Sequence, residues 1–140
     1  MQQSVIGKRA NLYWRTTPVM RYLLQAYHAN SQILVKCGEL DGLKSMSDIS
    51  AEISKEMSAI EAEIKGFLSL QTEIKNQIAA ATNDLRHRQI LELRYINGLS
   101  MQELADTLGY NKRYIERVRN KALAVFEQYL IANKINYQSA

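Results

Sequence analysis

Apolar side chains recur at alternating steps of four and three residues through the middle of the chain. The pattern, interrupted only by a polar glutamine, consists of Ile53, Met57, Ile60, Ile64, Phe67, Gln71, Ile74, Ile78, Ala81 and Leu85. Such steps place all members on one side of a helix and are typical of a heptad seam. The pattern predicts a helix from about residue 48 to 80, which would be about 50 Å long.

An earlier helix is predicted from residue 18 to about residue 42. Thr17 is a suitable N-terminal cap, and Pro18 suits the first helical position, where an N–H would have no partner. Gly38 and Gly42 weaken the end of this helix, and residues 44–47 are predicted to form a turn. The apolar stripe of the helix leads toward Leu40 and consists of Val19, Leu23, Ala26, Tyr27, Ile33 and Leu34.

The heptad seam must pack against other apolar side chains. One candidate is the preceding helix, folded back as an antiparallel hairpin, and the other is the same helix of a second copy. Both arrangements fit the pattern. A hairpin alone still exposes apolar surface along its length, so we expect a homodimer. The predicted oligomerisation seam consists of Ile53, Met57, Ile60, Ile64, Phe67, Ile74 and Ile78.

The C-terminal third carries the start and stop signals of three shorter helices. Apolar positions recur from residue 84 to 96, and an Asn-Gly pair then supplies a left-handed stop. Ser100 and Glu103 form a capping-box pattern that starts a second helix, which Gly109 ends. Asn111 is the expected cap of a third helix. The core side of that helix is predicted to consist of Ile115, Val118, Ala122, Phe126 and Tyr129.

The composition favours an all-α fold without catalytic chemistry. The 140 residues include one Pro and six Gly, so helix breakers are few. The single Cys37 cannot form an internal disulfide, and the two histidines, His28 and His87, offer no zinc-ligand spacing. The glycines are scattered and form no phosphate-binding loop. We therefore expect no enzymatic activity, no cofactor and no metal.

The net charge of +4 is distributed unevenly along the chain. Residues 1–36 contain five basic residues and no acid, whereas residues 37–83 contain four lysines and eight acids. Residues 84–140 contain nine basic and six acidic residues, and within them residues 111–121 carry five basic residues and one acid. Such a local excess of positive charge favours binding of a polyanion.

This basic segment begins the third C-terminal helix. Two helices joined by a tight turn, the second cationic near its start, form the geometry with which a recognition helix enters the DNA major groove. We therefore expect double-stranded DNA as the partner, because Arg can bind guanine with two hydrogen bonds and Asn can pair with adenine. At helical spacing, the side chains opposite the core side are Arg113, Glu116, Arg117 and Asn120, flanked by Lys112, Arg119 and Lys121.

The same segment resembles region four of bacterial RNA polymerase sigma factors, which binds the −35 promoter element. The resemblance runs through residues 88–105, across the Asn-Gly-Leu-Ser turn, and continues over residues 108–110 and 113–123, which end in Lys-Ala-Leu. In region four the opening turn of the recognition helix contacts the bases. The resemblance therefore implies base contacts from Lys112, Arg113, Glu116 and Arg117.

One departure from the family is Glu116, because region four commonly carries a basic residue at this position. It implies that a different DNA sequence is recognised or that a partner contact replaces a base contact. Together with the helical spacing, the predicted base contacts come from Lys112, Arg113, Glu116, Arg117 and Asn120. The predicted phosphate contacts come from Arg86, Arg88, Ser100, Tyr114, Arg119 and Lys121.

A short chain that joins this module to a helical N-terminal half is similar to phage-encoded transcriptional regulators of the ArpU and RinA type, which act on late operons. No counterpart of the sigma segments that hold core polymerase or melt the −10 element is present, so we do not expect a complete sigma factor. The resemblance implies a sequence-specific regulator in the cytoplasm of a bacterial host, with RNA polymerase as a further candidate partner. Two alternatives are a small-terminase-like DNA-packaging oligomer and a polymerase-binding protein that does not itself bind DNA.

The expected architecture is a long, coiled-coil-like N-terminal helical hairpin followed by a C-terminal three-helix domain with a helix-turn-helix. We expect a flexible basic arm over residues 1–16 and a hairpin for dimerisation or partner contact over 17–82. The DNA-binding domain is expected over 83–133 and a tail over 134–140. The longest apolar run, residues 122–126, is far shorter than the roughly 20 residues that a membrane-spanning helix needs, so no membrane partner is expected.

Overall fold

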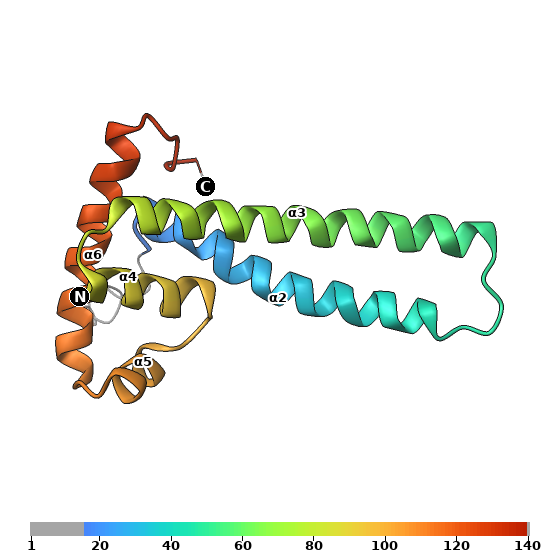
Figure 1. Cartoon of the computed structure of the whole chain (residues 1–140), viewed down its shortest axis with the longest axis horizontal. Coiled ribbons are helices and arrows are strands. Elements are labelled where there is room, and N and C mark those ends of the chain that lie inside the picture. Colours follow the sequence, from blue (N-terminus) through green and yellow to red (C-terminus); the bar gives the residue numbers. More distant parts are fainter. Residues whose placement is uncertain (1–15, 140) are drawn as a thin grey trace, which may run out of the picture.

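The computed structural model describes residues 16–139, so the predicted basic arm over residues 1–16 lies almost entirely outside the described residues. The described part is all-α, as predicted. Its elements are α2 (Pro18–Lys44), α3 (Ala51–Ala81), α4 (Leu85–Leu91), the π-helical segment η2 (Glu92–Ile96), α5 (Met101–Leu108) and α6 (Lys112–Ala132). Helices α2 and α3 form an antiparallel hairpin that extends from a head made of the remaining elements (Figure 1). None of the helices described here is both long and apolar enough to cross a membrane.

Side-chain caps define where the two long helices begin. The Oγ1 atom of Thr17 accepts a 3.3 Å hydrogen bond from the Met20 N–H, which confirms the predicted start of α2. Helix α3 begins at Ala51 rather than at residue 48, because Ser50 is the residue that caps it. Helix α2 continues through both of its glycines to Lys44, since its packing against α3 outweighs the roughly 1 kcal/mol that each glycine costs.

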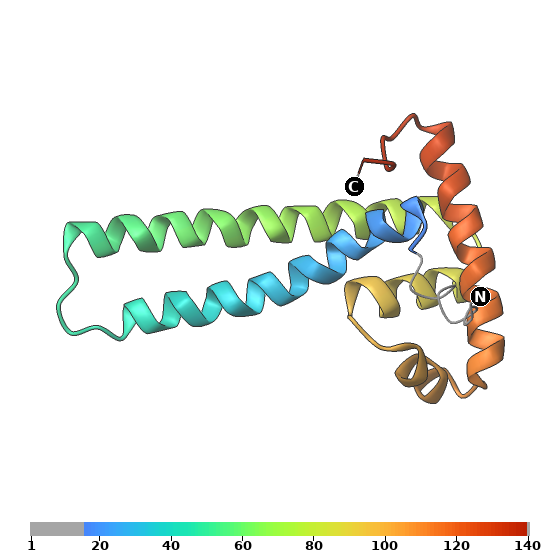
Figure 2. The same ribbon diagram turned by 180° about the vertical axis from the view of Figure 1, so that it is seen from behind.

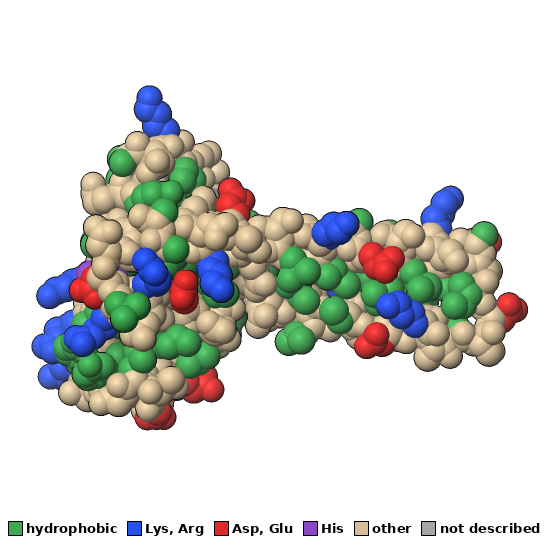
Figure 3. Space-filling view, viewed as in Figure 1, with side chains coloured by type: hydrophobic (Ala, Val, Ile, Leu, Met, Phe, Trp, Pro, Cys, Tyr) green, Lys and Arg blue, Asp and Glu red, His purple; other side chains and the backbone are tan. Residues whose placement is uncertain are grey.

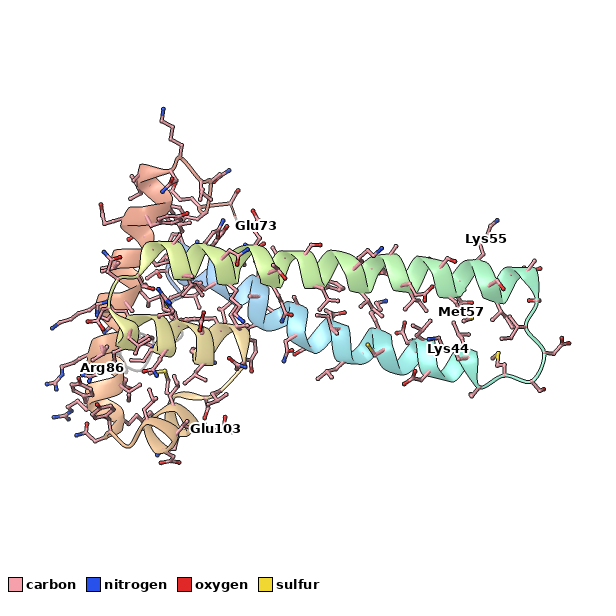
Figure 4. The ribbon with its side chains drawn as sticks, viewed as in Figure 1. Lys44, Lys55, Met57, Glu73, Arg86 and Glu103 are labelled. Atoms are coloured by element: carbon pink, nitrogen blue, oxygen red, sulfur yellow. The ribbon has the colours of Figure 1, made fainter. Side chains whose placement is uncertain are left out.

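The heptad seam of α3 packs against α2 of the same chain. Its buried members are Ile60, Ile74 and Ile78, and its half-buried members are Ile53, Met57, Ile64 and Phe67. The Gln71 Nε2 donates to the Ala26 carbonyl at 3.2 Å, and the Lys36 Nζ lies 3.5 Å from Glu63 Oε1. Met57 lies between the two helices near the tip of the hairpin (Figure 4). The predicted oligomerisation seam therefore packs within one chain, although four of its seven members keep part of their surface exposed. Its role in oligomerisation stays a prediction.

One hydrophobic core joins the base of the hairpin to the head. Its buried members are Val19, Tyr22, Leu23, Ala26, Ile74, Ile78, Leu91, Tyr95, Ala122, Leu123, Phe126, Leu130 and Tyr137. Seen from behind, the start of α2 and the end of α3 both lie beside α6 (Figure 2). The boundary predicted near residue 83 thus does not separate two hydrophobic cores.

Two residues lie where the sequence did not place them. Tyr137 belongs to the C-terminal tail, for which the sequence indicated no role, yet its side chain is buried and its hydroxyl donates to Glu127 Oε2 at 2.8 Å. Leu85 was expected to continue the seam, but 66% of its surface is exposed. The reason is that α3 ends at Ala81 and Leu85 begins a new helix in another direction.

Candidate nucleic-acid interface

Hydrogen bonds at both ends of α5 fix the first helix of the helix-turn-helix. The Ser100 Oγ accepts from the Glu103 N–H at 3.1 Å, and Glu103 Oε1 accepts from the Ser100 N–H at 2.8 Å. This is the predicted capping box, and its backbone hydrogen bond lowers the pKa of the Glu103 carboxyl below its ordinary value. Gly109 ends the helix with φ +76°, as predicted. Leu104 and Ala105 face a second, smaller core with Ile90 and Ile115.

The hairpin packs directly on the loop that precedes α5. Gly98 has φ +79°, which confirms the predicted left-handed stop. The preceding turn, Glu92–Ile96, is π-helical, which was not predicted. A Cβ atom on Gly98 would meet the Tyr27 ring of α2 at 3.6 Å. The Arg94 guanidinium lies 5.4 Å from the centroid of the same ring and donates to the Leu99 carbonyl at 3.1 Å. Helix α2 therefore supports the loop between α4 and α5.

Helix α6 presents a basic surface on the side away from the hairpin. Asn111 caps it, since its Oδ1 accepts from the Tyr114 N–H at 2.8 Å. Four of the five predicted base-contacting residues are exposed, namely Lys112, Arg113, Arg117 and Asn120. Asn120 also lines a pocket with Pro18 and Val19 at the start of α2. Lys and Arg side chains gather beside α4 and the first half of α6, at the end of the molecule opposite the hairpin tip (Figure 3). This end is the candidate nucleic-acid interface.

Two predicted base-contacting residues lie beside the base of the hairpin. Lys112 and Glu116 line a pocket between the start of α2, η2 and the first turns of α6. Lys112 is exposed at its rim, whereas Glu116 is half-buried. The remaining lining residues are Thr16, Met20, Leu24, Arg94, Tyr95, Met101 and Arg119. Glu116 thus faces the base of the hairpin more than the open surface, and its base contact stays a prediction.

Arg88 differs most from its predicted role as a phosphate-contacting residue. Its Nη2 donates to the carbonyls of Ala79 and Thr82, each at 3.3 Å, and thereby satisfies acceptors at the end of α3. The side chain is half-buried, and its Nε has no hydrogen-bond partner among the described residues. The structure therefore gives Arg88 a helix-capping role and turns it away from the exposed basic surface.

The remaining phosphate candidates are placed in different ways. Arg86 and Lys121 are exposed on the head. Ser100 uses its oxygen as a helix cap, which leaves only its hydroxyl proton free to donate. Arg119 is half-buried, and its Nη1 lies 3.8 Å from the Met101 sulfur. Tyr114 is half-buried and is engaged by Arg86.

Four side chains of the head lie together in what we call the tyrosine–arginine cluster: Arg86, Tyr110, Tyr114 and Arg117. Three of them were predicted DNA contacts, but Tyr110 and the contacts among the four were not predicted. Arg86 Nη1 donates to the Tyr114 hydroxyl, and its guanidinium carbon lies 5.1 Å from the Tyr110 ring centroid. The two rings pack with centroids 4.8 Å apart, and the Arg117 guanidinium lies 5.8 Å from the Tyr114 centroid. The hydrogen bond to the Tyr114 hydroxyl raises the pKa of the Arg86 guanidinium above its ordinary value. Two tyrosines four residues apart beside basic residues were the available signal.

A family model matches part of the head. Residues 84–125 match the family model of Sigma-70, region 4. Neither the curated proteins nor the solved structures gave a match to this chain. The matched residues cover α4, η2, α5 and the first two thirds of α6, which include both turns and the basic surface. This part of the chain is therefore a sigma region-four-like helix-turn-helix, which indicates a DNA-binding regulatory role.

Proposed function

We propose that this chain is a sequence-specific, non-enzymatic transcriptional regulator that inserts α6 into the DNA major groove. The observation that carries the proposal is the exposure of Arg113 and Arg117 on α6, within a helix-turn-helix that matches sigma region four. Asn120 is also exposed, although its Oδ1 accepts from Arg119 Nη2 at 3.1 Å. Arg can read guanine and Asn can read adenine in that groove. The two long helices of the hairpin run away from α6 (Figure 1).

The experiment has two stages. Duplexes bound by the full chain are first selected from a random pool and sequenced, which gives the site, its length and its symmetry. Arg113→Ala and Arg117→Ala are then measured on the best duplex, each with an expected loss of about 1–3 kcal/mol and relaxed specificity at one position. Lys55→Ala, which removes a charge on the hairpin, is the control (Figure 4). Unchanged affinity in both arginine variants would overturn the assignment of α6.

We further propose that the protein is encoded by a phage or prophage and acts on late-operon promoters. Its site of action would be the bacterial cytoplasm. The support is the combination of a region-four-like module with a preceding helical hairpin, as in regulators of the ArpU and RinA type. Transcription from late-operon templates with and without the chain tests this part. A ring of eight or more subunits would instead favour the packaging alternative. Co-purification of polymerase without salt-sensitive duplex binding would favour the polymerase-binding alternative.

A homodimer formed through the hairpin is also part of the proposal. Since the heptad seam packs largely within the chain, we place the contact on other, more exposed side chains of the hairpin. Leu34, Val35 and Leu68 on the hairpin are 69%, 53% and 47% exposed, respectively. A second copy packed on this surface would cover them and would bring two helix-turn-helix modules to one DNA.

A further inference from the structure

We propose that the tyrosine–arginine cluster is a phosphate clamp, in which Tyr110 and Tyr114 hold Arg86 ready to bind a DNA backbone phosphate beside the groove that α6 enters. The inference rests on the proposed DNA-binding function and deepens it. It makes Tyr110 a positioning residue that acts through Arg86. It gives Tyr114 two roles, because its hydroxyl engages Arg86 and can also donate to the phosphate.

Among residues 16–139, the two arginines of the cluster, Arg86 and Arg117, have no direct anionic partner. The nearest acid in the chain, Asp84, uses its carboxylate to accept the Arg86 backbone N–H at 2.8 Å and lies 3.9 Å from His87 Nε2. The Arg86 guanidinium thus contacts aromatic rings and a phenol, and its pKa is raised chiefly by the Tyr114 hydroxyl and least by the more distant Asp84 carboxylate. Because no carboxylate contacts it directly, its charge is available to an external anion.

The cluster has free N–H and O–H donors, which are the groups that a phosphate accepts from. Arg carries five N–H donors, and one of those on Arg86 is used by the Tyr114 hydroxyl. Because that hydroxyl accepts from Arg86, its own proton is free to be donated. A phosphate oxygen placed beside them would receive donors from both side chains. Arg is the side chain best suited to such a contact, since its planar group stacks on rings and binds phosphate with two parallel hydrogen bonds.

The position of the cluster favours a contact with the DNA backbone over a contact with the bases. Arg86 lies on the first turn of α4, not on the recognition helix, and its side chain points to the outer face of the head (Figure 4). The Schellman-type turn after Gly109, in which the Tyr110 N–H donates to the Ala105 carbonyl at 3.1 Å, places the Tyr110 ring at the start of α6. The clamp therefore flanks the exposed base-contacting face of α6, where a groove wall would lie.

The test measures affinity of the full chain for its best selected duplex as a function of salt. Arg86→Ala is expected to weaken binding about tenfold or more and to reduce the slope of log K against log salt by about 0.9. Lys55→Ala, on the hairpin, is the charge-matched control and should leave the slope as it is. Arg86→Lys keeps the charge but loses the stacking geometry, and we expect it to restore less than half of the lost affinity on a logarithmic scale.

The positioning role is tested on Tyr110, whose side chain is 40% exposed and can be changed without opening a core. Tyr110→Leu is expected to weaken binding about two- to fivefold, and Tyr110→Phe, which keeps the ring, should restore most of it. In the double variant Arg86→Ala/Tyr110→Leu, the loss should equal that of Arg86→Ala alone, because Tyr110 acts through Arg86. Thermal unfolding confirms that each variant is folded.

Three results separate the inference from the proposed function. Additive losses in the double variant, or an unchanged salt slope in Arg86→Ala, would overturn the clamp while duplex binding itself stands. Failure of Tyr110→Phe to restore the affinity lost in Tyr110→Leu would also overturn the role of the ring. If the unaltered chain binds no duplex at any salt concentration, the proposed function and the clamp fail together.

Discussion

The Tyr22 hydroxyl of α2 donates a 2.7 Å hydrogen bond to Gln77 Oε1 of α3, and both side chains are buried in the shared core. Burial also raises the pKa of the Tyr22 phenol, so the group stays neutral at physiological pH. Tyr22→Phe leaves the Gln77 oxygen without this donor. We expect it to lower the free energy of unfolding by about 1–3 kcal/mol, measured by urea denaturation.

The matched control for this pair is the double variant Tyr22→Phe/Gln77→Leu, which removes both polar partners. Because replacing both partners costs less than orphaning one, the double variant should recover part of the loss. A double variant no more stable than Tyr22→Phe would mean that the hydrogen bond is not the source of the effect.

The head depends on the hairpin for its core. Residues 83–140 alone lack Leu23, Ile74 and Ile78, which are fully buried against the head side of the core. Exposing the apolar surface of Phe126 and Tyr95 costs about 25 cal/mol per Å². We therefore expect this fragment to unfold with low cooperativity and a much lower Tm than the full chain, as measured by circular dichroism. A fragment with the Tm of the full chain would show that the head is an independent domain.

The capping box links the stability of α5 to pH. The pKa of Glu103 is lowered in the folded chain, chiefly by the Ser100 N–H, so its contribution to stability is complete at neutral pH. That contribution is lost as the pH falls through the lowered pKa. The difference in Tm between the unaltered chain and Glu103→Gln should be largest near pH 7 and shrink toward acid. A difference that is constant with pH would contradict the charge-assisted cap.

The proposed dimer depends on exposed side chains of the hairpin. Leu34→Glu and Leu68→Glu place charge on that surface, and we expect either variant to shift the chain from dimer to monomer in sedimentation equilibrium. Leu85→Glu is the control, because Leu85 is 66% exposed but lies on the head. A monomeric unaltered chain at every concentration tested would rule out the dimer.

Local signals in the sequence predicted the elements well. Three helices begin at the caps that were predicted: Thr17 before Pro18, Ser100 with Glu103, and Asn111. They were predictable because a cap depends only on residues within one turn. Both left-handed glycines, Gly98 and Gly109, end helical segments for the same reason.

Features that depend on residues far apart in the chain were not predictable in this way. The sequence placed Arg88 on the exposed surface, but the end of α3 offers carbonyls that turn it inward. Tyr137 is buried only because α6 and the hairpin meet beside it. The contact of Arg86 with Tyr110 and Tyr114 crosses more than twenty residues of chain and comes from the packing of α4 on α6.

Because the hairpin and α6 share one continuous core, we expect them to move as one rigid body. Leu23 of α2, Ile78 of α3 and Phe126 of α6 are all fully buried in that core, so one helix cannot tilt without disturbing the others. A partner that binds the tip of the hairpin would consequently set the orientation of α6 relative to the DNA. In a dimer joined by its hairpins, this rigid arrangement would dictate the distance between the two DNA half-sites.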